Sequence, residues 1–425
     1  MTVSVGYIVG GVSILAFGSY VIISVVLFKF PHLIHKKKQP KFRAVHISHR
    51  GGAADRIENT MEAFKNAVAA GTDMLELDCH LSLDQQVVVA HDDAFVRTCG
   101  CEGRITQTNY EDLPPLMKEV TVDFFPSMKG TGADRRMPLL EEVFEAFPCI
   151  PMNVDIKDDD DMLIEKVNAL IRKYDREDIT VWGNVKDRVC QKLYKVNPRV
   201  PLLFSGLRVL HLVLLFWTGL LPFVSIKETF LEVLAPVLVL DSERLFQRRF
   251  GCFIRFIVWT GDKLLIRPAL IRHLERRGIQ TFLWVLNTDF DFERAFKTGA
   301  SGVMTDRPHL LRAWLDQVKP GSASSREDMP TGWRRQQCPH QMRTETFLWV
   351  LNREYQFEAA FQAGATGVMT DRVWLLREYL QRTGRCLEQN NAAPLLNTAQ
   401  HLKCRGSQPG SAVELLKEIT LKDVE

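Results

Sequence analysis

Seven side chains that can act on a phosphate group occur at the ends of four strand-like segments. Three acidic side chains brought together would repel one another unless a cation lay between them, and ligands that are all oxygen favour Mg²⁺ or Ca²⁺ over zinc. An arginine and a lysine supply charge that holds a phosphate. Two histidines can serve as base and acid on opposite sides of a phosphorus atom. The set predicts phosphodiester hydrolysis, and it comprises His49, Arg50, Glu76, Asp78, His91, Asp155 and Lys157.

The spacing within these segments supports a shared site. Glu76 and Asp78 lie two residues apart, so both side chains project from one face of a strand, and Asp155 and Lys157 do the same. Taken singly, such an acidic pair is more often a solvated strand edge, so the prediction rests on the coincidence of all four segments. Glu58 precedes a helix start, where it could act on the helix dipole or steady the neighbouring His49 or Arg50.

The elements that must position these residues alternate between strand-like and helical patterns. Helical segments at 59–71, 138–147 and 162–174 are amphipathic, and the first carries a capping box of Asn59 and Glu62. The pattern predicts a TIM (β/α)8 barrel with active residues at the carboxyl ends of its strands. An open doubly wound sheet is the alternative, but the chain has no glycine-rich phosphate loop where that fold would use one. The eight predicted strands are 44–49, 73–79, 86–91, 151–157, 179–184, 200–205, 279–287 and 301–306.

The amino terminus is an apolar run without charge, from residue 3 to residue 28, longer than the ~20 residues that cross a bilayer. A cleaved signal peptide is the alternative, but no basic segment precedes the run and no small-residue cleavage site follows it. We therefore expect an uncleaved transmembrane anchor. Lysines at 29, 36–38 and 41 follow directly, and positive charge marks the cytoplasmic side, so the body should face the cytosol. The nine scattered cysteines are interpreted as reduced thiols, which agrees with a body that faces the cytosol.

A long insertion, residues 206–278, separates the sixth and seventh predicted strands, and its segment 207–224 is almost wholly apolar. A second membrane crossing there would put the last strands on the opposite side from the first six, and the barrel could not close. We expect this segment to face the membrane or to cap the barrel.

The carboxyl-terminal part contains a duplication. Residues 281–317 return as 346–382, and each copy reads strand, helix, strand, helix. Only one copy can close the barrel, and the first is assigned to it because it is joined more directly. The polar segment 318–345 is a linker, and the polar tail, residues 383–425, is expected to be disordered.

The motifs resemble those of the glycerophosphodiester phosphodiesterase family. They are HRG at 49–51, ENT at 58–60, ELD at 76–78, HD at 91–92 and NVDIK at 153–157. The anchor, the FPHLIHKKK that follows it at 30–38 and the apolar insertion resemble a small membrane-bound animal branch that includes enzymes with lysophospholipase D activity. The resemblance covers roughly residues 1–317, and the fold it implies is a TIM barrel.

This resemblance implies roles for individual residues. His49 and His91 correspond to the general acid and base, and Arg50 and Lys157 to phosphate-binding groups. Trp284 stands where the family often has an aromatic side chain lining the glycerol pocket, and core packing is the alternative. Asp155 stands where many members have glutamate, which puts the metal fit in question, and Arg307 replaces a residue that is often aromatic. The implied ligands of one divalent cation, Mg²⁺ or Ca²⁺, are Glu76, Asp78 and Asp155.

The implied reaction is hydrolysis of a lysophospholipid at a membrane. Lysophosphatidylcholine or N-acyl lysophosphatidylethanolamine would yield lysophosphatidic acid and the headgroup alcohol or an N-acylethanolamine. Soluble glycerophosphodiesters or phosphoinositides are alternative substrates, and an inactive membrane-tethered scaffold is the alternative of another class. The endoplasmic reticulum or another perinuclear membrane is the expected location. A net charge of +3 without a basic stripe does not argue for a nucleic-acid partner, so none is expected, and no protein partner is expected either.

Overall fold

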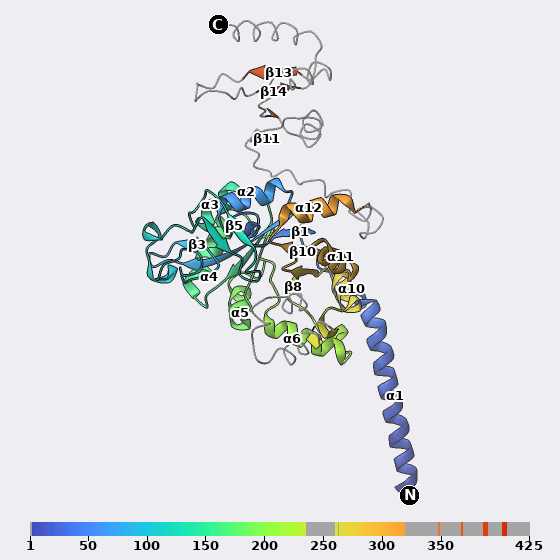
Figure 1. Cartoon of the computed structure of the whole chain (residues 1–425). Helices are drawn as coiled ribbons and strands as arrows, with labels where there is room; N and C mark the ends of the chain where they lie inside the picture. The colour runs from blue at the N-terminus through green and yellow to red at the C-terminus, as the bar shows by residue number, and fades with distance from the viewer. Residues whose placement is uncertain are drawn as a thin grey trace, which may run out of the picture. The chain divides into compact units, whose positions relative to one another are not determined.

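The structure is a computed structural model that describes residues 2–234, 260–261 and 263–318, together with four short strands further along the chain. The chain divides into two compact units, Met1–Met329 and Pro330–Glu425. The first unit contains the amino-terminal helix α1 (Thr2–Lys29) and an α/β body (Figure 1). All of the predicted site residues belong to this unit.

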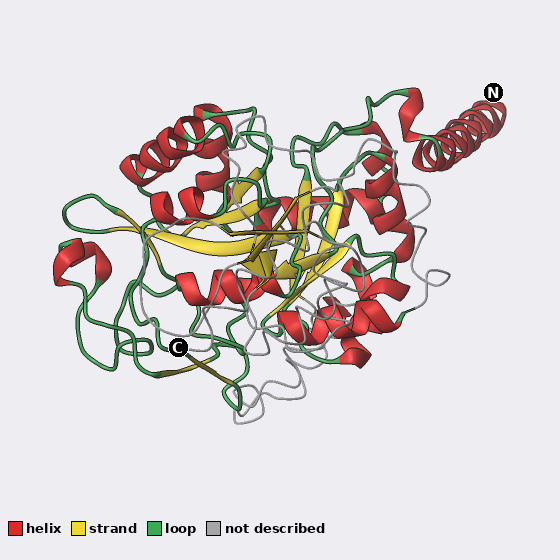
Figure 2. Cartoon of the chain, turned by 90° about the horizontal axis from the view of Figure 1, so that it is seen from above, coloured by secondary structure: helices red, strands yellow, loops and turns green. Residues whose placement is uncertain are grey.

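The body of the first unit is a closed parallel barrel. The strand order places β10 beside β1 in register, with His46 opposite Val303, and so joins the first strand to the last. The gap between β7 and β8 is closed by Leu202 and Leu203, which form single parallel bridges to Trp182 and Phe230. The predicted TIM barrel is confirmed, and Figure 2 shows its strands at the centre with helices outside them. Its named strands are β1 (His46–Ser48), β2 (Met74–Leu81), β6 (Met152–Ile156), β7 (Thr180–Gly183), β8 (Phe230–Leu234), β9 (Gln280–Trp284) and β10 (Gly302–Thr305).

One predicted strand is not part of the barrel wall. Residues 86–91 contain β3 (Val87–Val89), which pairs antiparallel with the end of β2. The strand that takes its place in the barrel is β8, which lies inside the predicted insertion 206–278. Short apolar runs look alike whether they form a hairpin or a parallel strand, so their pattern alone could not separate the two. Residues 204–229 alone separate the Leu202–Leu203 bridge from β8, so this connection is shorter than the predicted insertion.

The helices cover the barrel as expected for this fold. Their amino-terminal caps differ in one detail from the prediction: Thr60, not Asn59, caps α2, and its side chain accepts a hydrogen bond from the backbone N–H of Ala63 at 3.1 Å. Glu62 instead accepts from the backbone N–H groups of Ala133 and Asp134. The described helices are α2 (Met61–Ala69), α3 (Leu140–Ala146), α4 (Asp161–Lys173), α5 (Asp187–Val196), α6 (Gly206–Trp217), α10 (Pro268–Arg276), α11 (Asp289–Lys297) and α12 (Pro308–Gln317).

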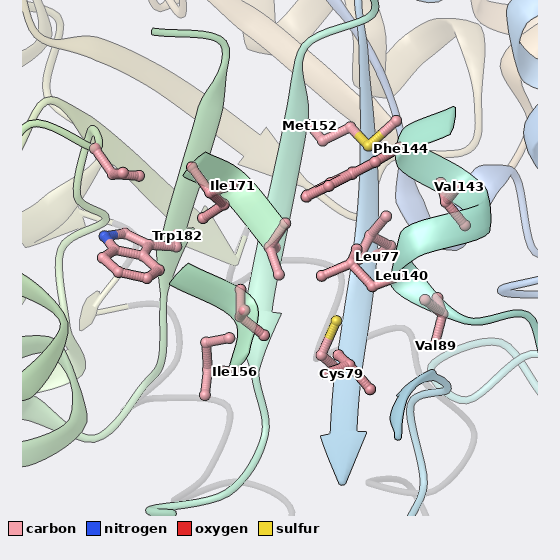
Figure 3. Packing of buried hydrophobic residues seen from close by; sticks show 14 of the residues in the cluster. Leu77, Cys79, Val89, Leu140, Val143, Phe144, Met152, Ile156, Ile171 and Trp182 are labelled. Carbon is pink, nitrogen blue, oxygen red and sulfur yellow. The ribbon is translucent and has the colours of Figure 1, made fainter. Parts of the chain in front are cut away.

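Apolar side chains fill both faces of the barrel wall. Between the wall and its helices, Leu77, Phe144 and Trp182 belong to one large buried cluster (Figure 3). Burial of each such side chain stabilises the fold by roughly 1.5–3 kcal/mol. Inside the barrel a second cluster forms an apolar floor beneath the carboxyl ends of the strands. The floor comprises Phe42, Ala44, Ile47, Met74, Val181, Leu203, Phe230, Phe282 and Met304.

The apolar segment 207–224 forms α6 and the short helix η5 (Leu221–Phe223). At 12 residues, α6 is about 18 Å long, too short to cross a bilayer core. Among the described residues, one helix, Gly11–Lys29 within α1, is long and apolar enough to span a membrane. The carboxyl-terminal half of α1 contacts the η5 region, where Ser24 Oγ donates to the carbonyl of Gly219 at 2.6 Å.

The first copy of the duplication supplies the last wall of the barrel, because it contains most of β9 and all of α11, β10 and α12. The second unit contains a four-stranded sheet in the order β11-β12-β14-β13. Its strands are β11 (Phe347–Leu348), β12 (Gly367–Val368), β13 (Cys386–Gln389) and β14 (Leu402–Arg405). The latter two fall within the predicted tail 383–425. The remaining residues of that tail and of the second copy, and nearly all of the predicted linker, lie outside the described residues.

The cysteines depart in one case from the prediction of reduced thiols. Cys79, Cys99, Cys101 and Cys190 are free. Cys149, in contrast, is disulfide-bonded, so the prediction is wrong for that residue.

Candidate active site

His49 is held at the mouth of the barrel by a buried carboxylate. It begins the short helix η2 (His49–Gly51) directly after β1, and its Nδ1 lies 2.7 Å from Oδ1 of Asp306, which follows β10. Asn287 Nδ2 donates to the other oxygen of Asp306 at 2.9 Å. Burial lowers the pKa of His49, and Asp306 partly opposes this. A neutral imidazole whose Nδ1–H donates to Asp306 presents its Nε2 as a proton acceptor.

The turn after His49 explains the glycines that follow it. Arg50 adopts a left-handed backbone conformation, with φ 51° and ψ 31°, which is uncommon for a residue with a side chain. Gly51 and Gly52 also have positive φ values, and a Cβ on Gly52 would lie 2.6 Å from Cδ of Pro308. In this turn the backbone N–H of Arg50 donates to Oε2 of Glu76 at 2.6 Å. The turn therefore ties the end of β1 to the acidic strand β2.

The guanidinium of Arg50 lies in a buried network of charges. Its Nη1 donates to Oε1 of Glu58 at 3.0 Å, and its Nε lies 3.6 Å from Oδ2 of Asp78. Burial alone would lower the pKa of Arg50, but Glu58, Asp78 and Glu76 together raise it. Arg97, which sequence analysis did not identify, also donates to Glu58, at 2.6 and 2.8 Å. Burial would raise the pKa of Glu58, yet the two arginines lower it to about 2. Glu58 is thus a buried counterion.

The three predicted metal ligands lie on neighbouring strands. Glu76 and Asp78 are on β2, and Asp155 on β6 is the register partner of Asp78. The ammonium of Lys157 lies between the two strands, with its Nζ 2.6 Å from Oδ1 of Asp78 and 2.7 Å from Oδ2 of Asp155. Burial disfavours ionisation of Asp78, but Lys157, His91 and Arg50 lower its pKa overall. Burial, and then repulsion by Asp78, raise the pKa of Glu76 well above its usual value.

These carboxylates fit a hard divalent cation by their chemistry. All the donors are oxygen, and burial with repulsion by Asp78 raises the pKa of Glu76 although Arg50 and Lys157 oppose this, so a cation beside the pair would stabilise its charged form. Among the described residues, no three histidine, cysteine, aspartate or glutamate side chains are already arranged as a metal cage. In this arrangement the ammonium of Lys157 lies against two of the three carboxylates.

His91 is the second histidine at the mouth, and it too is paired with a carboxylate. Its Nδ1 lies 2.6 Å from Oδ1 of Asp92, and its side chain is 22% exposed, against 5% for His49. His80 on β2 lies behind it, with Nε2 3.1 Å from the carbonyl of His91 and Nδ1 2.7 Å from Oδ2 of Asp158. His80 was missed because it has no sequence signal beyond its place in the strand. The mouth thus holds two histidine–carboxylate pairs, one buried and one open to solvent.

Aromatic side chains form one wall of the mouth. The ring centroid of Trp284, at the end of β9, lies 6.1 Å from that of His49 and 5.9 Å from that of Phe124. Phe124 belongs to the turn between β4 (Glu119–Thr121) and β5 (Lys129–Thr131). Asp123 in the same turn has Oδ2 4.0 Å from Nη2 of Arg50. This hairpin turn therefore reaches the mouth and narrows it beside the tryptophan.

A further acidic residue, Glu232, enters the barrel from β8. Its Oε1 accepts a hydrogen bond from Nδ2 of Asn153 at 2.7 Å. Burial raises its pKa to about 8, and the nearby Asp155 adds to this effect. Sequence analysis missed Glu232 because β8 was hidden in the predicted insertion. Asp306 could have been found, since it is the acidic residue that ends the last predicted strand.

Comparison with known proteins identifies the enzyme family to which this chain belongs. Residues 49–310 match the Glycerophosphoryl diester phosphodiesterase family, and the chain belongs to this family. It is therefore a phosphoric diester hydrolase, and enzymes of the family typically depend on a divalent cation.

Individual relatives narrow the comparison. Lysophospholipase D GDPD1 of Homo sapiens is 47% identical over 298 residues, which cover 70% of this chain and 94% of that protein. Lysophospholipase D GDPD3 of Homo sapiens is 40% identical over 310 residues, covering 73% of this chain and 97% of that protein. A solved glycerophosphoryl diester phosphodiesterase domain from Mycobacterium tuberculosis has a TM-score of 0.50 at 15% identity, covering 64% of this chain and all of that domain, and so supports the fold alone.

Proposed function

We propose that this chain is a metal-dependent lysophospholipase D. It hydrolyses lysophosphatidylcholine and N-acyl lysophosphatidylethanolamine to lysophosphatidic acid and choline or an N-acylethanolamine. The observation that carries the proposal is the barrel mouth, where two carboxylate-paired histidines, His49 and His91, flank a buried acidic cluster with Arg50 and Lys157. The names of the human relatives, lysophospholipase D GDPD1 and GDPD3, support the substrate class.

Each group of the mouth receives a role in this proposal. Arg50 and Lys157 bind the phosphate. Glu76, Asp78 and Asp155 would hold one divalent cation, which when bound would supply positive charge to the phosphate oxygens. His49 accepts a proton at Nε2 while Asp306 holds its Nδ1–H. His91, oriented by Asp92, donates a proton to the leaving alcohol. Mg²⁺ and Ca²⁺ both suit oxygen ligands, and the test below compares them.

The free glycerol hydroxyl of a lysophospholipid lies beside the phosphodiester and can serve as the nucleophile in the first step of hydrolysis. We infer that this free hydroxyl attacks phosphorus as His49 takes its proton, while the P–O bond to the headgroup breaks and His91 protonates the departing alcohol. The cyclic phosphate that results is then opened by water. A substrate methylated at that hydroxyl should then be inert. Ready hydrolysis of the methylated substrate would contradict this route and favour direct attack by water.

The apolar surface supports a substrate that resides in a membrane. Helix α1 exposes large apolar side chains between Val12 and Val26, and Leu210, Leu214 and Trp217 are exposed on the nearby α6. We infer from the lysines after α1 that the barrel lies on the cytosolic side of the endoplasmic reticulum or another perinuclear membrane, because positive charge favours that side. Protease protection in sealed microsomes tests the orientation, because a cytosolic barrel is digested without detergent.

The decisive experiment uses purified full-length protein in detergent with lysophosphatidylcholine. We expect choline release that needs Mg²⁺ or Ca²⁺, that a chelator abolishes and that Glu76→Ala lowers by at least about a hundredfold. Release of phosphocholine would indicate cleavage on the other side of phosphorus. Turnover of glycerophosphocholine alone would assign a soluble substrate. A folded protein with no metal-dependent turnover of any of these would instead be a scaffold.

A further inference from the structure

Arg97 contacts three separate parts of the barrel mouth at once. Its Nε donates to Oδ2 of Asp92, and its Nη2 and Nη1 donate to the two carboxylate oxygens of Glu58 at 2.6 and 2.8 Å. Nη1 also donates to the backbone carbonyl of Thr121 at 3.0 Å. Glu58 and Thr121 lie 39 and 24 residues away in the chain, so tertiary structure brings them to this one guanidinium.

A small buried apolar cluster fixes the backbone around Arg97 and its acceptors. Phe95, two residues before Arg97, is 3% exposed and belongs to this cluster. Ile57, directly before Glu58, is another member, and so is Val120 of β4, the strand that supplies the backbone acceptor. The three segments are therefore packed together independently of the guanidinium that connects their polar groups.

The contacts of Arg97 join two functional parts of the mouth. On one side, Asp92 uses its other oxygen, Oδ1, to hold Nδ1 of His91 at 2.6 Å. On the other side, Glu58 accepts a hydrogen bond from Nη1 of Arg50 at 3.0 Å. One guanidinium thus connects the carboxylate that holds His91 with the carboxylate that holds Arg50.

The chemistry of this position requires an arginine. Burial alone would raise the pKa of Asp92, but hydrogen bonds from His91 and Arg97 lower it. Burial would lower the pKa of Arg97 itself, but Glu58 and Asp92 raise it, so the guanidinium keeps its charge. A guanidinium carries five N–H groups in one plane and can reach acceptors on two sides, whereas the ammonium of lysine is a point charge.

We propose that Arg97 is a positioning residue for phosphodiester hydrolysis. It orients His91 through Asp92 and Arg50 through Glu58, so that the proton donor and the phosphate-binding group keep one relative geometry. This role rests on the proposed function, because that function assigns the proton and the phosphate to His91 and Arg50. Arg97 acts through its protein acceptors, to which it makes four hydrogen bonds, and we assign it no contact with the substrate.

The test compares two leaving groups on full-length protein in detergent with Mg²⁺. Lysophosphatidylcholine releases choline, which needs a proton as it departs, and the same lysophospholipid with p-nitrophenol in place of choline does not need one. We expect Arg97→Lys to lower kcat/KM about a hundredfold for lysophosphatidylcholine but only about fivefold for the p-nitrophenyl ester, because only the first requires His91 as an acid. The shared loss of about fivefold reports the looser Arg50, and calorimetry with sn-glycerol 3-phosphate should show the same loss of affinity.

A double variant tests whether Arg97 and Asp92 act along one path. Asp92→Asn combined with Arg97→Lys should lower kcat/KM for lysophosphatidylcholine by far less than the product of the two single losses, because both changes break the same connection. Arg104→Lys is the matched control, since Arg104 donates to Asp93 in the same part of the chain and its side chain is 57% exposed. It should leave both substrates and the affinity for sn-glycerol 3-phosphate unchanged.

Three results would overturn the proposal. They are equal losses on the two substrates in Arg97→Lys, wild-type kcat/KM in that variant, and losses that multiply in the double variant. If Arg97→Lys does not fold by circular dichroism, Arg97→Gln takes its place with the same expected pattern. A wild type that releases no choline from lysophosphatidylcholine would contradict the proposed function, while the change in sn-glycerol 3-phosphate affinity would still decide whether Arg97 positions Arg50.

Discussion

Each of the main charged residues at the barrel mouth contacts a partner of opposite charge. Glu58 lies between Arg50 and Arg97, Lys157 lies between Asp78 and Asp155, and each histidine has its own carboxylate. Removal of one partner from a buried ion pair leaves an uncompensated charge, which is strongly destabilising. Substitutions that keep the shape but change the charge are therefore the informative ones here.

Asp306→Asn tests the pairing that orients His49. The amide has an N–H group in place of one carboxylate oxygen, so it no longer favours the form of His49 that carries its proton on Nδ1. We therefore expect kcat to fall on the order of a hundredfold with KM nearly unchanged. The duplication offers a matched control, since Asp371 occupies the equivalent sequence position in the second copy. Choline release should be unchanged in Asp371→Asn. Equal losses in the two variants would contradict the assignment of the first copy to the site.

Because His46 is buried, we expect the folded protein to lose stability in acid. Burial, with the nearby positive Arg312 and His309, lowers its pKa from 6.5 to about 3. Between these two pH values the unfolded state binds a proton that the folded state refuses, so the free energy of unfolding falls as the pH falls, by up to roughly 1.4 kcal/mol per pH unit.

The measurement is urea unfolding in detergent at pH 7 and pH 4.5. From pH 7 to pH 4.5, His46→Leu should lose less stability than the wild type, by roughly 2 kcal/mol. His273, whose burial lowers its pKa to about 4, leaves part of the acid sensitivity in place. Parallel losses in the two proteins would show that His46 is not the source.

At the scale of elements, α6 presents one apolar stripe to solvent. Leu207, Leu210, Leu214 and Trp217 are all exposed, and their spacing of three and four residues places them on one face of the helix. Nearby, His273 of α10 stacks on Phe28 of α1, with ring centroids 4.4 Å apart, and its Nδ1 lies 2.8 Å from the carbonyl of Phe28. Phe28 also contacts Phe216 of α6, so the stripe belongs to the part of the barrel that α1 contacts.

Leu210→Glu combined with Leu214→Glu tests whether the stripe rests on lipid. We expect kcat/KM for lysophosphatidylcholine in vesicles to fall several-fold, because two carboxylates oppose insertion into the interface. Turnover of a soluble glycerophosphodiester should not change. Met162→Glu, which alters an exposed apolar residue of α4, serves as the matched control. An equal loss on both substrates would indicate damage to the fold instead.

At the scale of the whole molecule, the barrel and all the residues of the candidate site lie within Met1–Met329. β10 of the first repeat copy pairs with β1 and closes the wall without any strand from the second unit. A chain ending at Met329 should therefore keep metal-dependent choline release and a melting temperature within a few degrees of full length. Loss of both would show that the second unit is needed for the barrel.

The sequence by itself was sufficient for the parts of the site that are local in the chain. Glu76 with Asp78, and Asp155 with Lys157, share a face because side chains in a strand repeat every two residues. The alternation of strands and helices was sufficient for the barrel, and the long run without charge for the apolar helix α1. These features depend on the local geometry of strands and helices, and the spacing of residue types along the sequence reflects that geometry directly.

Only the tertiary structure decided which distant residues complete the mouth. Asp306 lies 257 residues from His49 in the chain, and it reaches that histidine because β10 pairs with β1. Glu232 entered the barrel only when β8 took the place that the sequence had assigned to β3. Closure of a barrel is a long-range event: it brings strand ends together through pairings that no local period encodes, so the partners of each charge could be assigned only once the strands were in place.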